Sequence, residues 1–391
     1  MAEGTYVVGV DGGGTKTEAV LVNEQGQVLG WGTGPPANPN RVSAEELLAS
    51  LQEAIGQAMS GHDGVSREAI LAQVPVSGTP PAAASREAIL AQAPVSGTPP
   101  AAVSREAILA QVPVSGAPPA AASREAILAQ VPVSGTPPAA ACFGLAGATG
   151  NEELVHQVAA RLGIGGKVVV VSDVVIAFWS AIAQAPGVVV VAGTGSCAYG
   201  VGPQGEPARA GGWGYLVGDE GSGYDVGRAG IAAALRAFDG RGPATALVER
   251  LLQCFHLDTA SQVVPALYHP PGGDSKARIS DFAPVVVQAA LQGDSVSHEI
   301  LCRAGRELGL SAVAVARQLA LCDREFELGL VGGVFKAGGL IVEPLRDVVL
   351  QFAPQARIFV SPRPPALGAA RLAWRAAGRE VAVEGAGIGG R

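Results

Sequence analysis

Two stretches of this sequence share one pattern, in which an apolar run enters a glycine-rich turn and a second apolar run follows. The first is VVGVDGGGTKTEAVLVN at residues 7–23, and the second is VVVVAGTGSCAYGV at residues 188–201. Valine-rich runs bounded by glycine are typical of β-strands. Each stretch therefore predicts two strands joined by a glycine turn. A third strand is expected after each pair, at 27–33 and within 206–214.

The remaining sequence alternates apolar runs with helical patterns. Further strands are expected at 140–147, 167–173, 326–331 and 356–361, and the run at 167–173 has the continuous apolar character of a fully buried parallel strand. Helices are expected at about 43–59, 151–163 and 174–184, over much of 222–325, and at 365–378. Ser43 and Glu46 form a capping-box pattern at the start of the first helix. The predicted fold class is α/β, with two halves that each open on a strand meander.

This layout divides the chain into an N-terminal domain, residues 1–184, and a C-terminal domain, residues 185–364; the helix at 365–378 could pack back on the first domain. Residues 66–141 are four near-identical copies of a 19-residue unit that begins SREAILAQ. Stacked repeats could form a solenoid or a partner-binding arm. Near-identity without distinct capping copies favours a tandem expansion within a surface loop, because long loop insertions add little closure entropy.

The composition argues against several functional classes. The 391 residues are 48% hydrophobic and 16% charged, with a net charge of −7, which indicates a globular protein and disfavours a nucleic-acid surface. No apolar run reaches the ~18 residues that span a membrane, and the N-terminus has no signal-peptide pattern. The five cysteines form no C-x-x-C pair, so neither a disulfide framework nor a zinc or iron–sulfur site is indicated. We therefore expect a cytoplasmic protein that binds neither nucleic acid nor membrane.

The first glycine turn, DGGGTKT, could bind phosphate although it matches neither the Walker A nor the dinucleotide-binding pattern. Its backbone N–H groups and the Thr15 hydroxyl could donate to phosphate oxygens. Asp11 cannot bind phosphate directly but could hold Mg²⁺ through water. The alternative is a tight hairpin with a solvated aspartate. The second turn, AGTGS, repeats the pattern, so two facing turns could clamp a polyphosphate from both sides.

Three other segments carry candidate site residues. GGWGYLVGDEGSG surrounds Trp213 and Asp219 with glycines, and sugar hydroxyls could partner its acids; the alternative is a helix start capped by Asp219 or Ser222. Asp173 ends a predicted strand and could accept a proton from a substrate hydroxyl, or it could simply cap the following helix. VGGVFKAGG could let an adenine ring lie on the backbone, or it could mark a close helix–strand crossing.

Together these segments resemble the superfamily of sugar kinases and actin-like ATPases. They most closely resemble the N-acetylglucosamine kinases, which share a family with the BadF/BadG/BcrA/BcrD-type ATPases. Five motifs occur in that family's order, namely DGGGTKT, VSDVVIA, AGTGS, GGWGYLVGD and VGGVFKAG. The resemblance covers nearly the whole chain outside 66–141. It implies two actin-like ATPase domains of the ribonuclease H-like type with a cleft between them.

The resemblance also implies a role for each motif. Asp11 would serve Mg²⁺, and Asp173 would be the catalytic base. The residues implied to bind ATP are Gly12, Gly13, Gly14, Thr15, Lys16, Gly193, Thr194, Gly195, Gly332, Gly333 and Lys336. The residues implied to bind the sugar are Asn38, Ser196, Gly212, Trp213, Gly214, Tyr215 and Asp219.

The implied activity is ATP- and Mg²⁺-dependent phosphorylation of an amino sugar, with the 6-hydroxyl of N-acetylglucosamine as the favoured acceptor. Whether the protein forms a homodimer is left open. Asn40 stands where the animal enzymes have tryptophan, which leaves the sugar and acyl-group preference open, and the repeat block is not a family feature. One alternative is an ATPase that activates a radical acyl-CoA dehydratase or reductase, which would need closely placed cysteines for an iron–sulfur cluster. The other alternative is a non-catalytic sugar-binding regulator.

Overall fold

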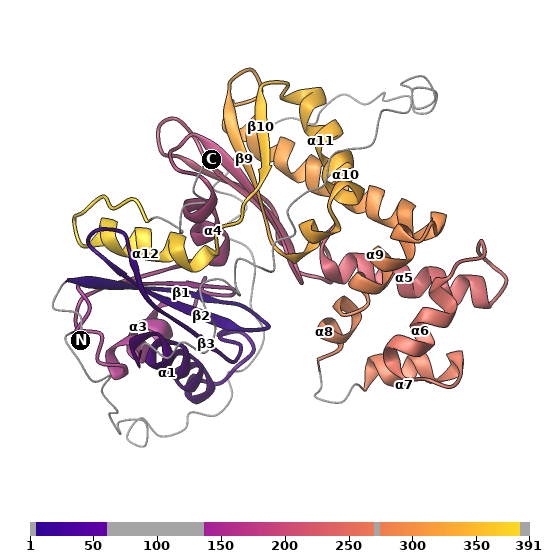
Figure 1. Cartoon of the computed structure of the whole chain (residues 1–391), viewed down its shortest axis with the longest axis horizontal. Helices are drawn as coiled ribbons and strands as arrows, with labels where there is room; N and C mark the ends of the chain where they lie inside the picture. Colours follow the sequence, from indigo (N-terminus) through magenta and orange to yellow (C-terminus); the bar gives the residue numbers. More distant parts are fainter. Residues whose placement is uncertain (1–4, 61–136, 270–273, 384–391) are drawn as a thin grey trace, which may run out of the picture. The chain divides into compact units, whose positions relative to one another are not determined.

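The computed structural model describes residues 5–60, 137–269 and 274–383 (Figure 1). In these ranges, ten strands form two mixed five-stranded sheets, and both sheets belong to one compact unit of the chain. The predicted α/β class is confirmed. The repeat block lies outside the described residues up to residue 136, so its interpretation as a loop stays a prediction.

The two sheets have the same strand arrangement. The first runs β3-β2-β1-β4-β5 and the second β10-β9-β6-β7-β8; in each, an antiparallel meander continues into two parallel strands. The strands of the first sheet are β1 (Tyr6–Gly12), β2 (Thr17–Asn23), β3 (Val28–Gly34), β4 (Ala140–Leu145) and β5 (Lys167–Ser172). Those of the second are β6 (Gly187–Ala192), β7 (Ser196–Val201), β8 (Pro207–Gly211), β9 (Phe326–Val331) and β10 (Ala356–Val360).

One strand differs from its expected environment. β5 pairs in parallel with β4, as predicted, but it lies at the edge of its sheet, and its residues are partly or fully exposed. The prediction of a fully buried strand was therefore wrong. A continuous valine run specifies an extended segment but not how many neighbours cover it, because burial depends on where the strand is placed in the sheet.

The helices pack on the faces of the two sheets. They are α1 (Ala44–Ser60), α3 (Glu152–Arg161), α4 (Asp173–Ala181), α5 (Gly223–Phe238), α6 (Leu247–Phe255), α7 (Val263–Tyr268), α8 (Ser275–Ser280), α9 (Ala283–Leu291), α10 (Ser295–Gln318), α11 (Gly339–Phe352) and α12 (Pro365–Ala376), with short 3₁₀ helices at Ala260–Gln262 and Gly333–Ala337. The capping box before α1 is confirmed, since the Ser43 and Glu46 side chains each accept from the other's backbone N–H. No helix within the described ranges has both the length and the apolarity needed to cross a membrane.

The first sheet is covered on both faces, with α1 and α3 on one face and α12 on the other (Figure 1). Successive residues of β1 point to opposite faces of the sheet, so Val7 packs with α12 and Val8 packs with α1 and α3. Two glycines allow close packing of α12, Gly9 against the first sheet and Gly368 against α4. A Cβ on Gly9 would lie 2.4 Å from the carbonyl oxygen of Ala366, and one on Gly368 would lie 1.9 Å from that of Ile176 in α4.

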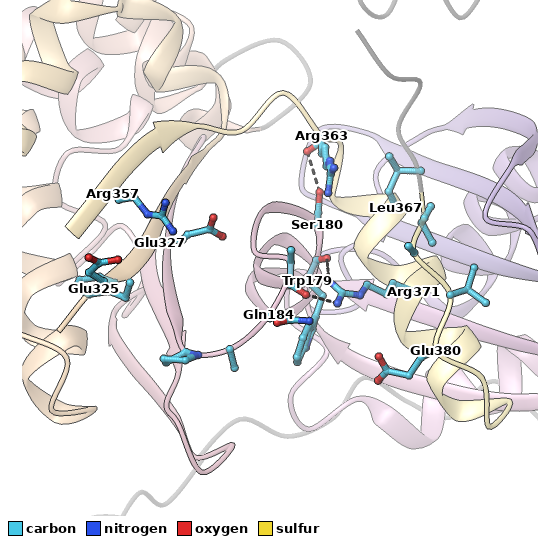
Figure 2. Close-up of a pocket in the computed structure, with 17 residues that line it drawn as sticks. Trp179, Ser180, Gln184, Glu325, Glu327, Arg357, Arg363, Leu367, Arg371 and Glu380 are labelled. Atoms are coloured by element: carbon cyan, nitrogen blue, oxygen red, sulfur yellow. Dashed lines mark hydrogen bonds between the residues drawn. The ribbon is translucent and has the colours of Figure 1, made fainter. Parts of the chain in front are cut away.

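Arg371 of α12 is directed at the end of α4 and lines a pocket of about 830 Å³ (Figure 2). Its guanidinium donates to the carbonyl oxygens of Trp179 at 3.4 Å and Ile182 at 3.0 Å, and to that of Ala183. The guanidinium also lies 5.2 Å from the centre of the Trp179 ring. Because the last carbonyls of a helix lack intrahelical donors, Arg371 supplies the C-terminal cap that α4 needs.

Replacing Arg371 with methionine is expected to lower the free energy of unfolding by about 1.5–3 kcal/mol, the usual contribution of hydrogen bonds made by a charged donor. The methionine keeps much of the apolar stem but leaves the carbonyls at the end of α4 without their donor. Urea unfolding would measure the change. Arg346→Met removes a cation from an exposed ion pair with Glu343 and should change stability by less than about 0.5 kcal/mol. Equal stability of the two variants would contradict the capping role.

Candidate functional site

A second pocket, of about 640 Å³, brings together most of the predicted site residues. It lies where the glycine turns of both sheets meet the segments that follow β4, β5 and β8. The predicted residues that line it are Asp11, Gly13, Gly14, Thr15, Lys16, Asn38, Asp173, Gly193, Thr194, Gly195, Ser196, Gly212, Trp213, Gly214 and Asp219. Five predicted residues do not line it, namely Gly12, Tyr215, Gly332, Gly333 and Lys336.

The two glycine turns are built alike. In the first, the N–H of Gly13 donates to the carbonyl oxygen of Lys16 at 3.0 Å. In the second, the N–H of Gly193 donates to the carbonyl oxygen of Gly195 at 2.9 Å. Each turn leaves the next two backbone N–H groups, those of residues 14 and 15 and of residues 194 and 195, without an acceptor among the described residues. The pocket therefore presents two pairs of free donors, which is the arrangement that binds phosphate oxygens.

Two carboxylates in the pocket have no cationic partner among the described residues. The Oδ1 atom of Asp173 accepts from the Ser172 hydroxyl at 2.9 Å and from the Val174 N–H at 3.0 Å, whereas its Oδ2 atom has no described partner. Ser172 occupies the N-cap position of α4 but makes no side-chain capping bond, so Oδ1 of Asp173 satisfies a free N–H of the first turn while its Oδ2 atom stays available. Burial, followed by the negative charges of Glu18 and Asp173, raises the pKa of Asp11 to about 8.

Two neighbouring carboxylates fit a divalent cation, because a bound cation would favour the ionised form of Asp11 that burial and the nearby negative charges disfavour. Carboxylate oxygens are preferred ligands of Mg²⁺, which is commonly held by one or two carboxylates together with water and substrate phosphates. No group of three or more His, Cys, Asp or Glu side chains in the described part of the chain could hold a metal by itself. Asp11 beside the first glycine turn is therefore the carboxylate best suited to hold Mg²⁺ together with a bound phosphate.

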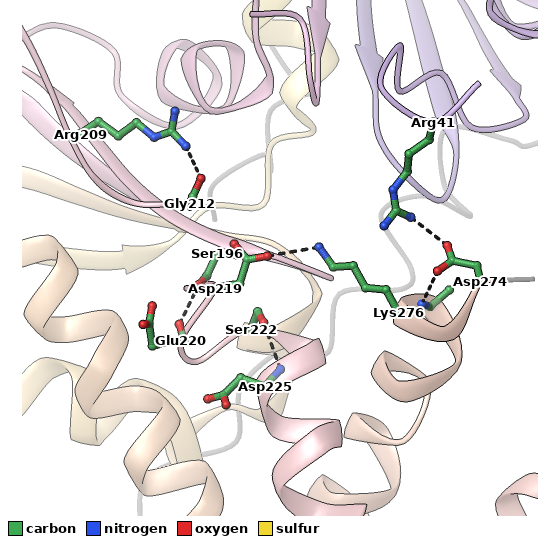
Figure 3. Close-up of polar contacts among 11 residues, drawn as sticks. Arg41, Ser196, Arg209, Gly212, Asp219, Glu220, Ser222, Asp225, Asp274 and Lys276 are labelled. Atoms are coloured by element: carbon green, nitrogen blue, oxygen red, sulfur yellow. Dashed lines mark hydrogen bonds and ion pairs between the residues drawn. The ribbon is translucent and has the colours of Figure 1, made fainter. Parts of the chain in front are cut away.

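The segment after β8 forms another wall of the pocket (Figure 3). Asp219 is buried, and it has a left-handed backbone with φ of 60°. It lies against the second glycine turn, because a Cβ on Gly195 would be 2.9 Å from its Oδ2 atom. The Ser196 hydroxyl donates to the carbonyl oxygen of Glu220 at 2.7 Å and so ties the turn to this segment. Ser222, not Asp219, caps α5, and Asp219 instead accepts from the Ser196 N–H at 3.5 Å through its Oδ1 atom.

Trp213 provides the pocket with an aromatic surface. Its side chain is 78% exposed, although the segment that carries it is fixed at both ends by buried or hydrogen-bonded residues. Arg209 donates to the carbonyl oxygen of Gly212 at 2.6 Å, immediately before Trp213. An exposed ring at a pocket wall can pack against the apolar face of a sugar ring.

Packing explains several of the predicted residues that lie outside the pocket. A Cβ on Gly12 would lie 2.4 Å from the Leu145 side chain, and a Cβ on Gly332 would lie 2.3 Å from the carbonyl oxygen of Ala192. Gly332 thus packs against the end of the neighbouring strand β6, which is not the helix–strand crossing given above as the alternative, and its role at an adenine ring stays a prediction. Gly333 and Lys336 are exposed. The Tyr215 ring packs edge-on against Tyr224, with the ring centres 5.1 Å apart.

Sequence reasoning missed several residues that line the pocket. They are Arg41, Gly147, Thr149, Arg209, Asp274 and Lys276, together with Glu18; Asn40, which the sequence analysis connected with sugar preference, also lines the pocket. Asn40 is fixed by Asn151, whose side-chain amide donates to its oxygen at 2.8 Å. The glycine in AGATGN was a signal for Gly147, which has a φ of 82°. Asp274 and Lys276 lie in an ordinary polar stretch and carry no comparable local signal.

Comparison with known proteins identifies the family. The model of the BadF/BadG/BcrA/BcrD ATPase family matches residues 8–373. The chain belongs to this family. The match includes both glycine turns, Asp173 and the segment from Gly212 to Asp219, so the residues gathered in the pocket all lie within the shared domain.

Two relatives of this chain are sugar kinases by name. An N-acetylmuramic acid/N-acetylglucosamine kinase of Clostridium acetobutylicum is 36% identical over 234 residues, which cover 59% of this chain and 76% of the relative. An N-acetyl-D-glucosamine kinase of Dictyostelium discoideum is 33% identical over 188 residues, which cover 48% of this chain and 59% of the relative.

Solved structures show the same fold. A candidate N-acetylglucosamine kinase from Chromobacterium violaceum has a TM-score of 0.59 at 22% identity and covers 94% of this chain and 99% of its own. A ROK family glucokinase from Streptomyces griseus, in complex with glucose and AMPPNP, has a TM-score of 0.50 at 17% identity and covers 95% and 99% of the two chains. At these identities the likeness concerns the fold, which agrees with the two similarly built sheets described above.

Proposed function

We propose that this protein is an ATP-dependent sugar kinase that transfers the γ-phosphoryl group of ATP to an amino sugar, with the 6-hydroxyl of N-acetylglucosamine as the favoured acceptor. Membership of the BadF/BadG/BcrA/BcrD ATPase family and the activities of the two named relatives support this proposal. The observation that carries it is the coexistence, in one pocket, of two glycine turns with free backbone donors and a carboxylate with a free oxygen.

The nucleotide side of the site consists of backbone donors and one acid. The free N–H groups of Gly14, Thr15, Thr194 and Gly195 would donate to phosphate oxygens. Asp11 would hold Mg²⁺, which when bound neutralises charge on the phosphates. Such a site promotes phosphoryl transfer mainly through positioning and electrostatic stabilisation.

The acceptor side of the site centres on Asp173. Its Oδ1 atom is fixed by two donors, so the carboxylate has a defined orientation, and its free Oδ2 atom would accept the proton of the attacking hydroxyl. Asn38, Trp213 and Asp219 line the same pocket and would bind the sugar. Of these, Asp219 is an acceptor for sugar hydroxyls, and the Trp213 ring is a surface for the sugar face.

A coupled assay of ADP release over a panel of sugars tests this function. N-acetylglucosamine, N-acetylmuramic acid, glucosamine and glucose would each be supplied with ATP and Mg²⁺, against a control without sugar. We expect N-acetylglucosamine to give the highest kcat/KM, and phosphorus NMR of the product to place the phosphate on O6. Sugar-independent ADP release together with iron in the purified protein would favour the dehydratase-activating alternative. Sugar binding without turnover would favour a regulator.

A further inference from the structure

The short helix α8 contacts two separate walls of the pocket (Figure 3). Asp274 caps its N-terminus by accepting from the N–H of Ala277 at 3.0 Å, and Lys276 lies one residue into the helix. The side chains of Asp274 and Lys276 line the pocket, and each forms an ion pair with a residue far away in sequence.

Lys276 reaches the sugar-binding acid proposed above. Its Nζ atom lies 3.2 Å from Oδ2 of Asp219, and the two side chains are only 16% and 6% exposed. The same Nζ atom lies 5.2 Å from the centre of the Tyr215 ring, whose face attracts a cation. A buried carboxylate is costly without a counter-charge, and Lys276 supplies that counter-charge to Asp219.

The partner of Asp274 belongs to the opposite wall. Nη1 of Arg41 lies 2.8 Å from Oδ2 of Asp274. Arg41 follows the tight turn of Asn38, whose carbonyl oxygen accepts from the Arg41 N–H at 2.8 Å. The helix is thus connected on one side to the turn that holds Asn38 and on the other to Asp219.

We propose that Lys276 is a positioning residue for the acceptor sugar, which holds Asp219 as an oriented carboxylate, and that the Arg41–Asp274 pair fixes the helix from which Lys276 extends. This inference rests on the proposed sugar kinase function. It assigns to Lys276 a larger effect on sugar binding than on nucleotide binding, because among the described residues Lys276 forms its ion pair with Asp219 and its cation–π contact with Tyr215, and no hydrogen bond or ion pair with residues 13–16 or 193–195.

The test compares the KM values for the sugar and for ATP. Lys276→Met is expected to raise the sugar KM at least about 10-fold while changing the ATP KM less than about twofold, as expected for the loss of binding to one substrate. Lys276→Arg, which restores a cation, should return the sugar KM to within about threefold of the unmodified enzyme. In an Asp219→Asn background, Lys276→Met should add less than about twofold, because the carboxylate that it serves is gone.

One control variant and one further test variant make the result specific. Arg241→Met removes a cation from an exposed ion pair with Asp239 outside the pocket and should leave both KM values unchanged. Arg41→Met removes the partner of Asp274 and should raise the sugar KM about two- to fivefold. Because the Arg41–Asp274 pair is half-exposed, its loss should have little effect on the stability of the protein.

The possible outcomes distinguish failure of the positioning role from failure of the proposed kinase function. An unchanged sugar KM in Lys276→Met, with normal turnover of the unmodified enzyme, would overturn the positioning role alone. Equal increases in the sugar and ATP KM values would also overturn it, since that result indicates general loosening. No sugar-dependent turnover in the unmodified enzyme would refute the proposed function and the positioning role together. If Lys276→Met fails to fold, Lys276→Gln, which removes the cation but keeps a polar side chain, carries the same expectation for the sugar KM.

Discussion

Replacing Asp173 with asparagine is expected to lower kcat for sugar phosphorylation by about 10²- to 10⁴-fold, the usual contribution of a general base. The amide has nearly the shape of the carboxylate, and its oxygen can still accept from Ser172 and from the Val174 N–H, as Oδ1 of Asp173 does. Its NH₂ group, however, cannot take the proton that Oδ2 would accept. The loss should therefore fall on the chemical step rather than on folding.

The measurements that accompany this change separate chemistry from binding. The dissociation constant of a fluorescent ATP analogue should stay within about twofold, because Asp173 forms no hydrogen bond or ion pair with either glycine turn in the described residues. Asp239→Asn, an equivalent change in an exposed ion pair outside the pocket, should leave kcat unaltered. Retention of more than about a tenth of the original kcat in Asp173→Asn would remove Asp173 from the role of base.

Local sequence patterns predicted the strand framework and the glycine turns because both depend on short-range chemistry. Glycine between two valine runs specifies a hairpin whose backbone donors stay accessible, and both turns in the structure have this form. The Ser43–Glu46 capping box was equally local. Such features need only a few neighbouring residues, so a single sequence is enough to predict them.

The features that sequence missed depend on contacts between distant segments. Lys276 and Asp219 are 57 residues apart, and Arg41 and Asp274 are 233 apart, so no local pattern marks either pair. The exposure of β5 likewise follows from its edge position in the sheet. Gly332 was ambiguous for a related reason, because glycine serves both close packing and ligand approach, and its contact with Ala192 in β6 could not be predicted from local sequence.

Asp11 should oppose stability while supporting activity. Its pKa of about 8 in the folded protein lies above the value of 3.8 for an ordinary aspartate. Between these pH values the folded protein holds a proton that the unfolded chain releases, so the stability contributed at this position falls as pH rises, by at most about 1.4 kcal/mol per pH unit. Below about pH 4 both states are protonated, and above about pH 8 the penalty is complete.

Replacing Asp11 with asparagine is therefore expected to stabilise the protein in EDTA and to lower kcat by about 100-fold or more, because the amide carries no charge with which to hold Mg²⁺. The gain in melting temperature over the unmodified protein should be near zero at pH 4, should increase towards pH 8 and should then level off. Mg²⁺ with ATP should narrow this gap, because binding at the carboxylate stabilises only the unmodified protein. A melting temperature of Asp11→Asn below that of the unmodified protein at pH 8 in EDTA would show that the ionised Asp11 carboxylate does not destabilise the fold. Unchanged kcat at saturating Mg²⁺ would exclude Asp11 from the metal site, and the free donors of the two glycine turns would then have to balance the phosphate charge without it.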